Sequence, residues 1–380
     1  MLHCEQETGY AIGSLEKTFE AAALACGFPA ENILWSYSRV RSPGPRIYEI
    51  GYYHPEDARK LEAVNREHPL HTILAFDMPY PNPVAEQARL IGVPNLISYW
   101  GASMSGLNRG VKLLAKRLEW QLRKRHAPTL FIFESEAMRL TAVRGRGVPH
   151  QSTRVIPLGV DTRKFRPLPG SKYAHRAFNI PEQRHIIFFS GHMEERKGVR
   201  VLVEAMNVLR KRQALEPFHL LVCGNKGNES APYEALIADS ITREHITFGG
   251  YRDDIPELMQ SCYVGVIAST GWDSFTMSSV EMMASGLPLI VSDLQGLRET
   301  TDPGVTGMLI QPGDAEALAQ RLLLYLANPE MHESHSRRAR ERAIENFSVE
   351  LQIDRLAAEL DPQGFACAES RTVPNQEAGQ

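Results

Sequence analysis

The sequence predicts an α/β protein with two domains of similar size, each built around a parallel sheet. The chain has 380 residues, about twice the length of a typical domain. Short apolar runs rich in β-branched residues alternate with helical segments at the spacing of β-α-β units. A polar stretch rich in proline and glycine, around residues 166–170, separates two such series and indicates a linker.

Composition narrows the class of protein. Hydrophobic residues make up 43% of the chain and charged residues 23%, as in ordinary globular proteins. The net charge of −3 excludes a globally basic nucleic-acid binder, so we expect no nucleic-acid partner. The five cysteines are odd in number and widely separated, which favours reduced thiols. No apolar run reaches the ~20 residues of a membrane span and the start lacks a secretory leader, so we expect a cytoplasmic protein.

The first half begins with the tail of a strand at residues 2–4. A loop over residues 5–14 follows and leads into a helix at 15–26. The loop holds Gly9 and Gly13, which suit either a tight turn or the close approach of a ligand to the backbone. Further strands are predicted at 33–38, 48–53, 71–76, 95–100 and 129–133, with helices at 55–67 and 83–91.

A basic segment at residues 109–126 has helical periodicity. It contains several Lys and Arg residues but only one acidic residue, Glu119. Val111, Leu114, Leu118 and Leu122 recur at helical spacing, which predicts that this apolar face packs while the other carries charge. The charged face is either a solvated surface or a contact for an anionic membrane or a phosphate-bearing acceptor.

The second series of strands starts near residue 185. Apolar runs predict strands at 186–189, 218–222, 246–248, 263–268 and 289–291. Helices are predicted at 199–211, 255–261, 315–327, 329–346 and 349–360, and the last twenty residues indicate a disordered tail.

The loops that follow the strands of the second half carry the candidate ligand-binding residues. A loop at 191–198 holds Gly191, His192 and Lys197, and further loops contain Gly224 and the pair Tyr251 and Arg252. The carboxyl ends of parallel strands share one edge of a sheet, so these loops should gather there. A cation, free N–H groups and a carboxylate at such an edge suit a nucleoside diphosphate.

The stretch 268–288 joins a strand, a polar loop and a helix, and two carboxylates bracket it. Asp273 lies in the loop and Glu281 in the helix; taken alone, Asp273 is better explained as a cap of the loop, and Glu281 as part of a solvated helix face, than as ligand contacts. Free N–H groups at a helix start, with the helix dipole behind them, form an anion site. Those groups belong to Phe275, Thr276, Met277 and Ser278.

Several motifs in this order resemble the retaining GT-B glycosyltransferases of family 4. That family's Glu-x7-Glu motif corresponds to residues 273–281, and its Glu-Ala-Met-Ala-Ser-Gly-x-Pro segment to residues 281–288. Its Gly-Val-Asp-x-x-x-Phe linker corresponds to residues 159–165, and its Lys-Gly loop to residues 197–198. The resemblance is dense from about residue 155 to 360 and sparse before it.

The resemblance implies a fold of two Rossmann-like domains facing across a cleft. Its implied domains are an acceptor-binding domain at 1–165, a linker at 166–183 and a nucleotide-sugar donor domain at 184–345. A C-terminal helix at 346–362 would pack back on the first domain, with a disordered tail at 363–380.

The resemblance also implies a reaction and roles for matching positions. Lys197 would bind the donor diphosphate, Glu281 the ribose, and Asp273 hydroxyls of the transferred sugar. Gly13 would let the first-domain loop approach the diphosphate, and the turn at Tyr251 and Arg252 would face the base. The reaction would retain the anomeric configuration and need no metal. The acceptor would be a saccharide, a lipid-linked saccharide or a small molecule.

Three positions depart from the family pattern. Asp273 replaces a glutamate, His192 stands where an arginine is usual, and Trp100, followed by Gly101, stands where many relatives have a histidine that touches the donor sugar. We interpret Trp100 either as an apolar wall near carbon 6 of the sugar or as a core residue that closes its strand. A nucleotide-sugar-binding protein without catalysis is the alternative function, and an epimerase with a similar cleft matches the motifs less well.

Overall fold

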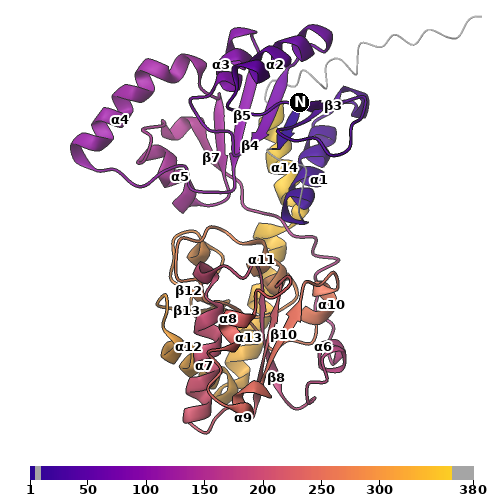
Figure 1. The fold of residues 1–380 in the computed structure, drawn as a ribbon, viewed down its shortest axis with the longest axis vertical. Helices are drawn as coiled ribbons and strands as arrows, with labels where there is room; N and C mark the ends of the chain where they lie inside the picture. Colours follow the sequence, from indigo (N-terminus) through magenta and orange to yellow (C-terminus); the bar gives the residue numbers. More distant parts are fainter. Residues whose placement is uncertain (5–9, 362–380) are drawn as a thin grey trace, which may run out of the picture. The chain divides into compact units, whose positions relative to one another are not determined.

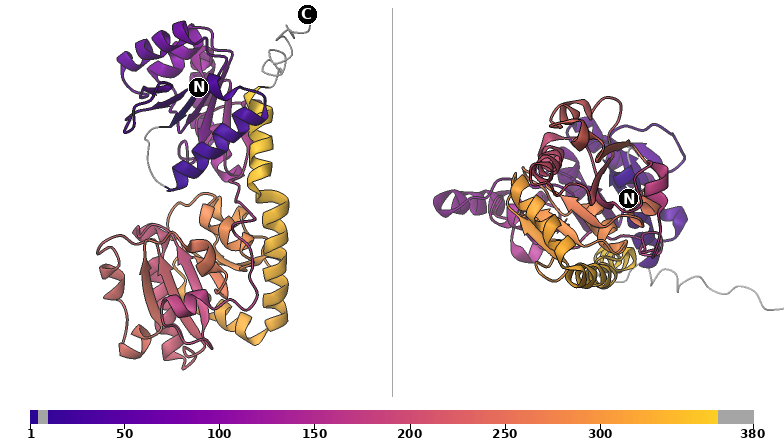
Figure 2. Two further views of the ribbon diagram at one scale, coloured as in Figure 1. Left: turned by 90° about the vertical axis from the view of Figure 1, so that its right-hand side faces the viewer. Right: turned by 90° about the horizontal axis from the view of Figure 1, so that it is seen from below.

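The computed structural model describes residues 1–4 and 10–361 and divides the chain into two compact units. Unit 1 comprises residues 1–157 together with the chain from residue 350 onward, and unit 2 comprises residues 158–349. Figures 1 and 2 show helices covering both faces of the sheet in each unit. The expected tail at 363–380 and the loop at 5–9, including Gly9, lie outside the described residues.

Unit 1 is built on a parallel sheet that, within the described residues, has seven strands in the order β3-β2-β1-β4-β5-β6-β7. The strands are β1 (Leu2–Cys4), β2 (Trp35–Tyr37), β3 (Ile47–Glu49), β4 (Thr72–Phe76), β5 (Asn95–Trp100), β6 (Leu130–Phe133) and β7 (Thr153–Val155). The helices are α1 (Tyr10–Ala25), α2 (Pro55–Glu67), α3 (Pro83–Leu90), α4 (Gly110–Arg123), α5 (Glu136–Val143) and α14 (Val349–Leu360), with short 3-10 turns at Ala30–Asn32, Lys124–His126 and His150–Ser152.

Unit 2 is built on a second parallel sheet, with six strands within its described residues in the order β10-β9-β8-β11-β12-β13. The strands are β8 (His185–Ser190), β9 (Phe218–Cys223), β10 (Ile246–Gly250), β11 (Val264–Ile267), β12 (Leu289–Ser292) and β13 (Gly307–Ile310). The helices are α6 (Tyr173–Ala177), α7 (Val199–Lys211), α8 (Ala231–Glu234), α9 (Ser240–Arg243), α10 (Ile255–Met259), α11 (Met277–Ala284), α12 (Ala315–Ala327) and α13 (Pro329–Phe347), with 3-10 turns at Glu195–Lys197 and Leu297–Glu299.

Local sequence signals explain where these elements lie. The central strands β6 and β11 are buried along their whole length, as expected for parallel strands covered on both faces. Asn82 caps α3 by accepting a hydrogen bond from the Ala85 N–H at 2.9 Å, and Pro83 follows at the first helical position. Gly286, with φ of +80°, ends α11.

Several predictions from the sequence are confirmed. The helices at 55–67, 199–211, 315–327 and 349–360 have the predicted bounds, as does the strand at 95–100. The thiols of Cys4, Cys26, Cys223 and Cys262 are free. Over residues 1–4 and 10–361, no helix combines the length and the apolar character that crossing a membrane requires.

The start predicted for the first helix is wrong. Helix α1 begins at Tyr10, so Gly13 lies inside a helix rather than in a loop. A glycine inside a helix costs only ~1 kcal/mol relative to alanine, so it does not by itself end one. The same helix buries Leu15 and Phe19 in the core of unit 1, which favours its formation.

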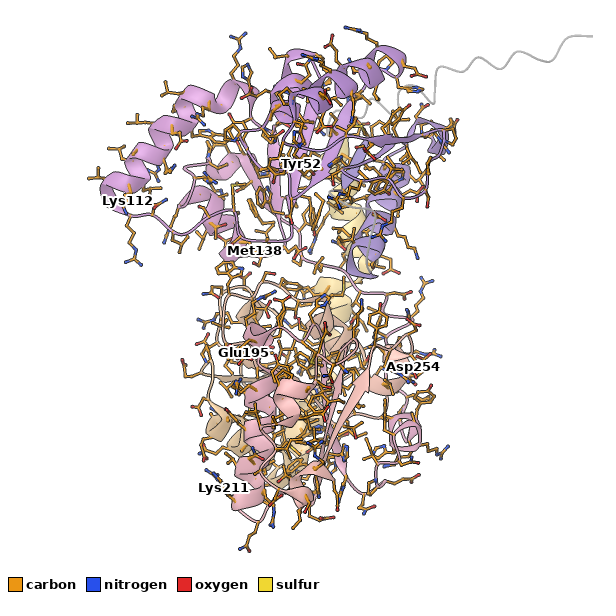
Figure 3. All side chains as sticks on the ribbon, in the orientation of Figure 1. Tyr52, Lys112, Met138, Glu195, Lys211 and Asp254 are labelled. Carbon is orange, nitrogen blue, oxygen red and sulfur yellow. The ribbon has the colours of Figure 1, made fainter. Side chains whose placement is uncertain are left out.

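The packing predicted for the basic helix is also wrong. Val111, Leu114, Leu118 and Leu122 of α4 are all exposed. Helical periodicity identifies residues that share a face, but it does not determine which face meets the protein. The contact with unit 1 is made instead by Trp120, which is buried against Phe131 and Tyr80. Figure 3 shows α4 with Lys112 labelled on it.

The units differ in detail from the domains expected from the sequence. Residues 158–165 belong to unit 2, where Leu158, Val160 and Phe165 are part of the core. The expected linker contains α6, and Ala174 and Ile180 are buried in the same core.

Candidate functional site

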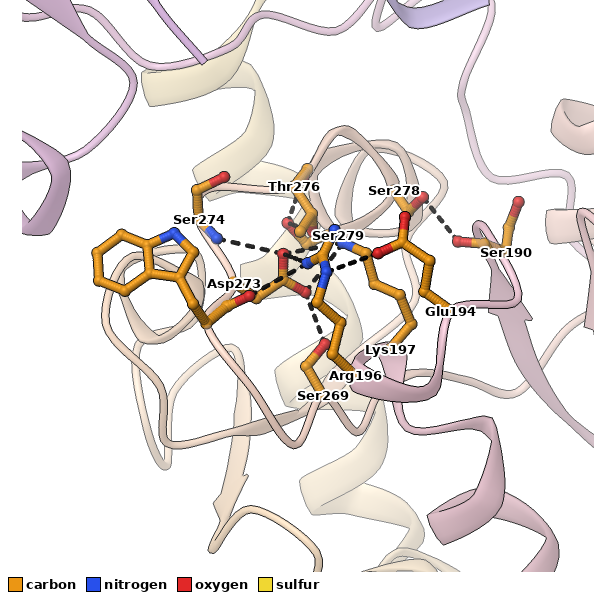
Figure 4. A network of polar contacts seen from close by, with 11 residues as sticks. Ser190, Glu194, Arg196, Lys197, Ser269, Asp273, Ser274, Thr276, Ser278 and Ser279 are labelled. Carbon is orange, nitrogen blue, oxygen red and sulfur yellow. Dashed lines mark hydrogen bonds and ion pairs between the residues drawn. The ribbon is translucent and has the colours of Figure 1, made fainter. Parts of the chain in front are cut away.

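Asp273 is the centre of a polar network in the loop between β11 and α11 (Figure 4). Its side chain is 3% exposed. Lys197 Nζ donates to both carboxylate oxygens, at 2.9 and 3.1 Å. Ser269 Oγ donates to Oδ2 at 2.6 Å, and the Ser274 N–H donates to Oδ1 at 3.2 Å. The carboxylate is therefore held in one place by a cation and two neutral donors.

A tight turn brings Lys197 to this carboxylate. Gly198 has φ of +78° and follows Lys197 directly. A Cβ atom on Gly198 would lie 1.8 Å from the carbonyl oxygen of Ala268, so only glycine lets the loop after β8 approach the end of β11. The Thr270 N–H then donates to the Arg196 carbonyl oxygen at 2.8 Å and fixes the two loops together.

Arg196 is a second cation at this site, and the sequence analysis missed it. Its Nη1 atom lies 3.7 Å from Asp273 Oδ1 and donates to the Trp272 carbonyl oxygen at 3.1 Å. Its Nε atom donates to Glu194 at 2.7 Å. The signal was present, since Arg196 directly precedes Lys197 in the same loop.

The first turn of α11 offers backbone donors beside this network. No residue in the described part of the chain accepts a hydrogen bond from the backbone N–H groups of residues 275–278. Ser278 Oγ donates to the Ser190 carbonyl oxygen at 2.8 Å, which fixes the helix start to the end of β8. Phe275 contributes only its backbone, because its ring is buried 5.0 Å from the ring of Phe347. Glu281, one turn into the same helix, is 6% exposed.

The ends of β8, β9 and β10 meet at glycines. Gly224 has φ of +110°, and a Cβ atom there would lie 2.2 Å from the carbonyl oxygen of Gly191. The Gly224 N–H donates to the Gly250 carbonyl oxygen at 2.8 Å. The Gly250 N–H in turn donates to Asn225 Oδ1 at 3.0 Å, so backbone contacts and one amide side chain hold the ends of these strands together.

Three further predicted residues lie around this edge of unit 2. His192 is exposed, and Tyr251 is 51% exposed with Lys226 Nζ 4.7 Å above its ring. Arg252 is bound to Asp254 through two hydrogen bonds, and this pairing lowers the pKa of the Asp254 carboxyl. The Arg252 guanidinium is thus already engaged within the protein.

Trp100 and Gly101, like Gly13, belong to unit 1. Trp100 ends β5, and its buried Nε1 atom finds no acceptor among the residues described. The Gly101 N–H donates to Asp77 Oδ1 at 2.8 Å. A Cβ atom on Gly101 would lie 2.9 Å from the ring of Phe76, so a larger residue here would displace that ring.

Glu134 is a candidate residue that the sequence analysis did not select. It follows β6 at the carboxyl edge of the unit 1 sheet and is 5% exposed. Burial, and secondly the charge of Asp77, raise the pKa of the Glu134 carboxyl well above its ordinary value. A signal was available, because Glu134 directly follows an apolar strand.

The chemistry of the site in unit 2 suits an anionic ligand. Lys197, Arg196 and the N–H groups at the start of α11 are positive or partly positive, and Asp273 and Glu281 can accept hydrogen bonds from hydroxyl groups. Over residues 1–4 and 10–361, no three His, Cys, Asp or Glu side chains gather so as to hold a metal ion.

One family model matches this chain, and the matched residues lie within unit 2. The family model of the glycosyl transferases group 1 matches residues 171–342. A phosphatidyl-myo-inositol mannosyltransferase of Mycobacterium leprae (strain TN) is 32% identical over 154 residues, which cover 40% of this chain and 39% of that protein. A D-inositol 3-phosphate glycosyltransferase of Salinispora tropica is 29% identical over 231 residues, 57% of this chain and 47% of that protein. The chain spans about half the length of the curated relatives it matches.

Solved structures resemble the chain over nearly its whole length. The crystal structure of a glycosyltransferase from Rickettsia africae ESF-5 has a TM-score of 0.77 at 18% identity and covers 95% of this chain and 99% of that one. The crystal structure of Anabaena Alr3699/HepE in complex with UDP has a TM-score of 0.71 at 20% identity and covers 94% and 98%. These likenesses concern the fold alone. With its two parallel sheets and its likeness to these solved structures, the chain has the GT-B fold, and residues 171–342 of unit 2 match the family of the glycosyl transferases group 1.

Proposed function

We propose that this chain is a retaining glycosyltransferase, which moves a sugar from a nucleotide-diphosphate sugar to a hydroxyl group of an acceptor. The observation that carries the proposal is the pairing of Lys197 with Asp273 beside the open N-terminus of α11. Both lie within the segment that matches the family. Lys197 and the N–H groups of Thr276 and Met277 bind the donor diphosphate, Glu281 binds the ribose, and Asp273 binds hydroxyls of the sugar.

The proposed reaction needs positive charge where the diphosphate departs. The bond from the anomeric carbon to the diphosphate breaks, and the acceptor oxygen bonds to that carbon on the same face. The departing diphosphate takes the proton of the acceptor hydroxyl, so the charges balance. Lys197 and the dipole of α11 stabilise the negative charge that develops on the phosphate, and the family resemblance implies that no metal is required.

The proposed acceptor is a saccharide, a lipid-linked saccharide or a small molecule, in polysaccharide, glycolipid or glycosylated-metabolite biosynthesis of a bacterium. The carboxyl edge of the unit 1 sheet supplies groups for its hydroxyls. These are the unpaired Nε1 atom of Trp100 and the carboxyl group of Glu134. The proposed location is the cytoplasm, at the inner face of the membrane where residues 109–126 make peripheral contact.

A nucleotide-sugar-binding protein without catalysis is the second candidate. The observation that favours it is the occupation of the Asp273 carboxylate, which already accepts hydrogen bonds from Lys197, Ser269 and Ser274. The replacement of the usual arginine by His192 and of the usual histidine by Trp100 also favours binding without catalysis. Such a protein would bind UDP-sugars or GDP-sugars and would transfer nothing.

Mass spectrometry of products from a panel of donors and acceptors, run with and without membranes, tests the transferase. We expect product with wild type, and a loss of at least ~100-fold with Lys197→Ala or Glu281→Gln, because one oriented charge is worth ~3 kcal/mol in a transition state. Lys211→Ala and Glu257→Gln are matched controls on the surface of unit 2 and should retain activity. Donor binding without hydrolysis or transfer would support the second candidate instead. Activity in the presence of EDTA checks the absence of a metal requirement.

A further inference from the structure

Helix α4 presents an apolar stripe to solvent. Val111 is 83% exposed, Leu114 and Leu118 are each 58% exposed, and Leu122 is 85% exposed. Their spacing of three and four residues places them on one face over about three turns. Leaving such a stripe in water is unfavourable, since each leucine would gain ~1.5–3 kcal/mol by full burial. A stripe of this kind marks an interaction surface.

The opposite face of α4 fixes the direction of this stripe. Trp120 is 7% exposed, and its ring lies 5.9 Å from that of Phe131 and 5.8 Å from that of Tyr80. At about 100° per residue, Trp120 lies opposite Val111 on the helix. The stripe therefore faces away from the body of unit 1, and α4 extends outward from that unit in Figure 1.

Basic side chains border the stripe on both sides. At about 100° per residue, Lys112 and Arg123 lie between the stripe and the Trp120 face on one side and Arg117 on the other, and Lys124 follows in the 3-10 turn; all four are exposed. Residues 109–126 contain seven Lys or Arg residues and one Glu, whereas the whole chain has a net charge of −3. Glu119 pairs with Lys116 at 2.6 Å and also lies 3.8 Å from Arg123, so it offsets part of the positive charge on that flank.

We propose that α4 lies in the headgroup region of an anionic bilayer, with its apolar stripe inserted among the acyl chains. The basic flanks then reach outward to lipid phosphates, as lysine and arginine do at membrane interfaces. The charge distribution argues against two other occupants. A second copy of α4 would bring like charges together beside the stripe, and a nucleic acid would leave the leucines in water.

Vesicle flotation of the full chain tests this surface without donor or acceptor, so its outcome is independent of glycosyl transfer. The probes are vesicles of phosphatidylcholine alone and vesicles with about one third phosphatidylglycerol. We expect binding to the anionic vesicles, and at least ~10-fold weaker binding to the neutral ones, because each basic residue near the surface contributes about fivefold. Raising the salt concentration should weaken binding to the anionic vesicles.

Variants assign the binding to the stripe and its flanks. Leu118→Ser and Leu122→Ser should each weaken binding ~10-fold, since each removes one inserted side chain. Leu90→Ser is the matched control, because Leu90 is 64% exposed on α3 and should not affect binding. Arg117→Gln with Lys124→Gln should weaken binding to the anionic vesicles by up to ~25-fold, at about fivefold per residue, and Lys211→Gln should not.

Two results would overturn the proposal. One is the absence of binding by wild type, and the other is equal binding by the Leu118→Ser and Leu90→Ser variants. Light scattering without lipid tests the rival occupant, which is a second copy of this chain. If wild type is a dimer and Leu118→Ser is a monomer, the stripe is a dimer interface and not a membrane contact. Far-UV circular dichroism checks that each variant is folded.

Discussion

At the scale of single residues, the pair formed by Lys197 and Asp273 determines the character of the site. The Asp273 side chain is 3% exposed and that of Lys197 is 16% exposed, so both charges are largely removed from water. Removing one partner of such a pair leaves an uncompensated charge, which costs more than removing both. The pair is thus a rigid anchor for the loop as well as a feature of the proposed donor site.

A double-mutant cycle measures this coupling. Lys197→Met and Asp273→Asn should each reduce the free energy of unfolding, and the double variant should lose less than their sum, with a coupling of about 1–3 kcal/mol. Urea unfolding followed by circular dichroism gives the values. Arg212→Met with Glu316→Gln is the control cycle, because those side chains are 39% and 58% exposed and should couple by less than ~1 kcal/mol. Similar coupling in the two cycles would show that burial does not strengthen the first pair.

The raised pKa of Glu134 predicts that the free energy of unfolding depends on pH. Its pKa is raised in the folded state by burial and then by Asp77, so the folded protein holds this proton to a higher pH than the unfolded chain does. The stability that the proton confers is complete below the ordinary pKa of 4.5 and is lost as pH rises through the raised pKa.

Glu134→Gln removes this titration. We expect the variant and wild type to differ little in free energy of unfolding near pH 4, and the variant to become the more stable of the two as pH rises above 4.5. Denaturant unfolding from pH 4 to 9 measures the difference. Glu20→Gln, an exposed position on α1, is the control and should follow wild type. A constant difference between Glu134→Gln and wild type at every pH would contradict the prediction.

Candidate site residues could be selected from the sequence where they belong to short motifs. The spacing of Asp273 and Glu281 and the Lys-Gly step at 197–198 are local features, and the structure places Lys197 on Asp273. The role of Arg196 and the burial of Glu134 depend on contacts between distant segments, such as Arg196 with Trp272. The sequence marks both positions, since Arg196 precedes Lys197 and Glu134 follows an apolar strand, but it does not show which distant groups they meet.

At the scale of elements, helix α14 ties the end of the described chain to unit 1. Leu356 and Leu360 are buried in the same core as Phe19 of α1 and Tyr99 of β5. Gln352 Nε2 donates to the Tyr99 hydroxyl at 3.2 Å, and Thr72 Oγ1 donates to the Leu360 carbonyl oxygen at 2.9 Å. Unit 1 is therefore closed by residues more than 250 positions away from the β4 and β5 residues to which they are hydrogen-bonded.

Leu356→Ala tests how much α14 contributes to unit 1. The side chain is fully buried, so its truncation should reduce the free energy of unfolding by about 2–5 kcal/mol. Arg355→Ala, an exposed neighbour on the same helix, should change it by less than ~0.5 kcal/mol. Hydrogen exchange of β4 and β5 should increase in the first variant. Unchanged exchange in those strands would mean that α14 does not stabilise them.

Helices were predicted best where a proline or a capping residue marks their start. The helix at 55–67 follows a proline start and the helix at 315–327 starts at Asp314, which caps it, and both have the predicted bounds. The start of α1 was missed because Gly13 gave a misleading signal. The face of α4 was assigned wrongly because amphipathic periodicity is the same for a helix packed on protein and one facing a partner.

At the scale of the whole molecule, each unit has its own sheet and its own buried cores. Clusters around Phe19 and around Leu61 cover the two faces of the unit 1 sheet, and clusters around Leu202 and around Met282 cover those of unit 2. Two domains of parallel sheet were predictable from length and from the alternation of elements. The membership of residues 158–165 in unit 2 was not, because it depends on contacts such as the Val160 N–H with the Phe347 carbonyl oxygen at 2.8 Å.

Separate cores predict that a ligand of one unit stabilises that unit selectively. The proposed diphosphate site, with Lys197, Asp273 and α11, consists of unit 2 residues. A ligand that binds only the folded state stabilises it by RT ln(1 + [L]/Kd), about 2.7 kcal/mol at one hundred times Kd. UDP at such a concentration should slow hydrogen exchange in β8 and β11 by up to ~100-fold and leave β4 and β5 unchanged. Lys197→Ala should abolish the effect, and Lys211→Ala should retain it. Equal protection of both sheets by UDP would show that the two units open cooperatively. If UDP protects neither sheet, the proposed nucleotide site is wrong.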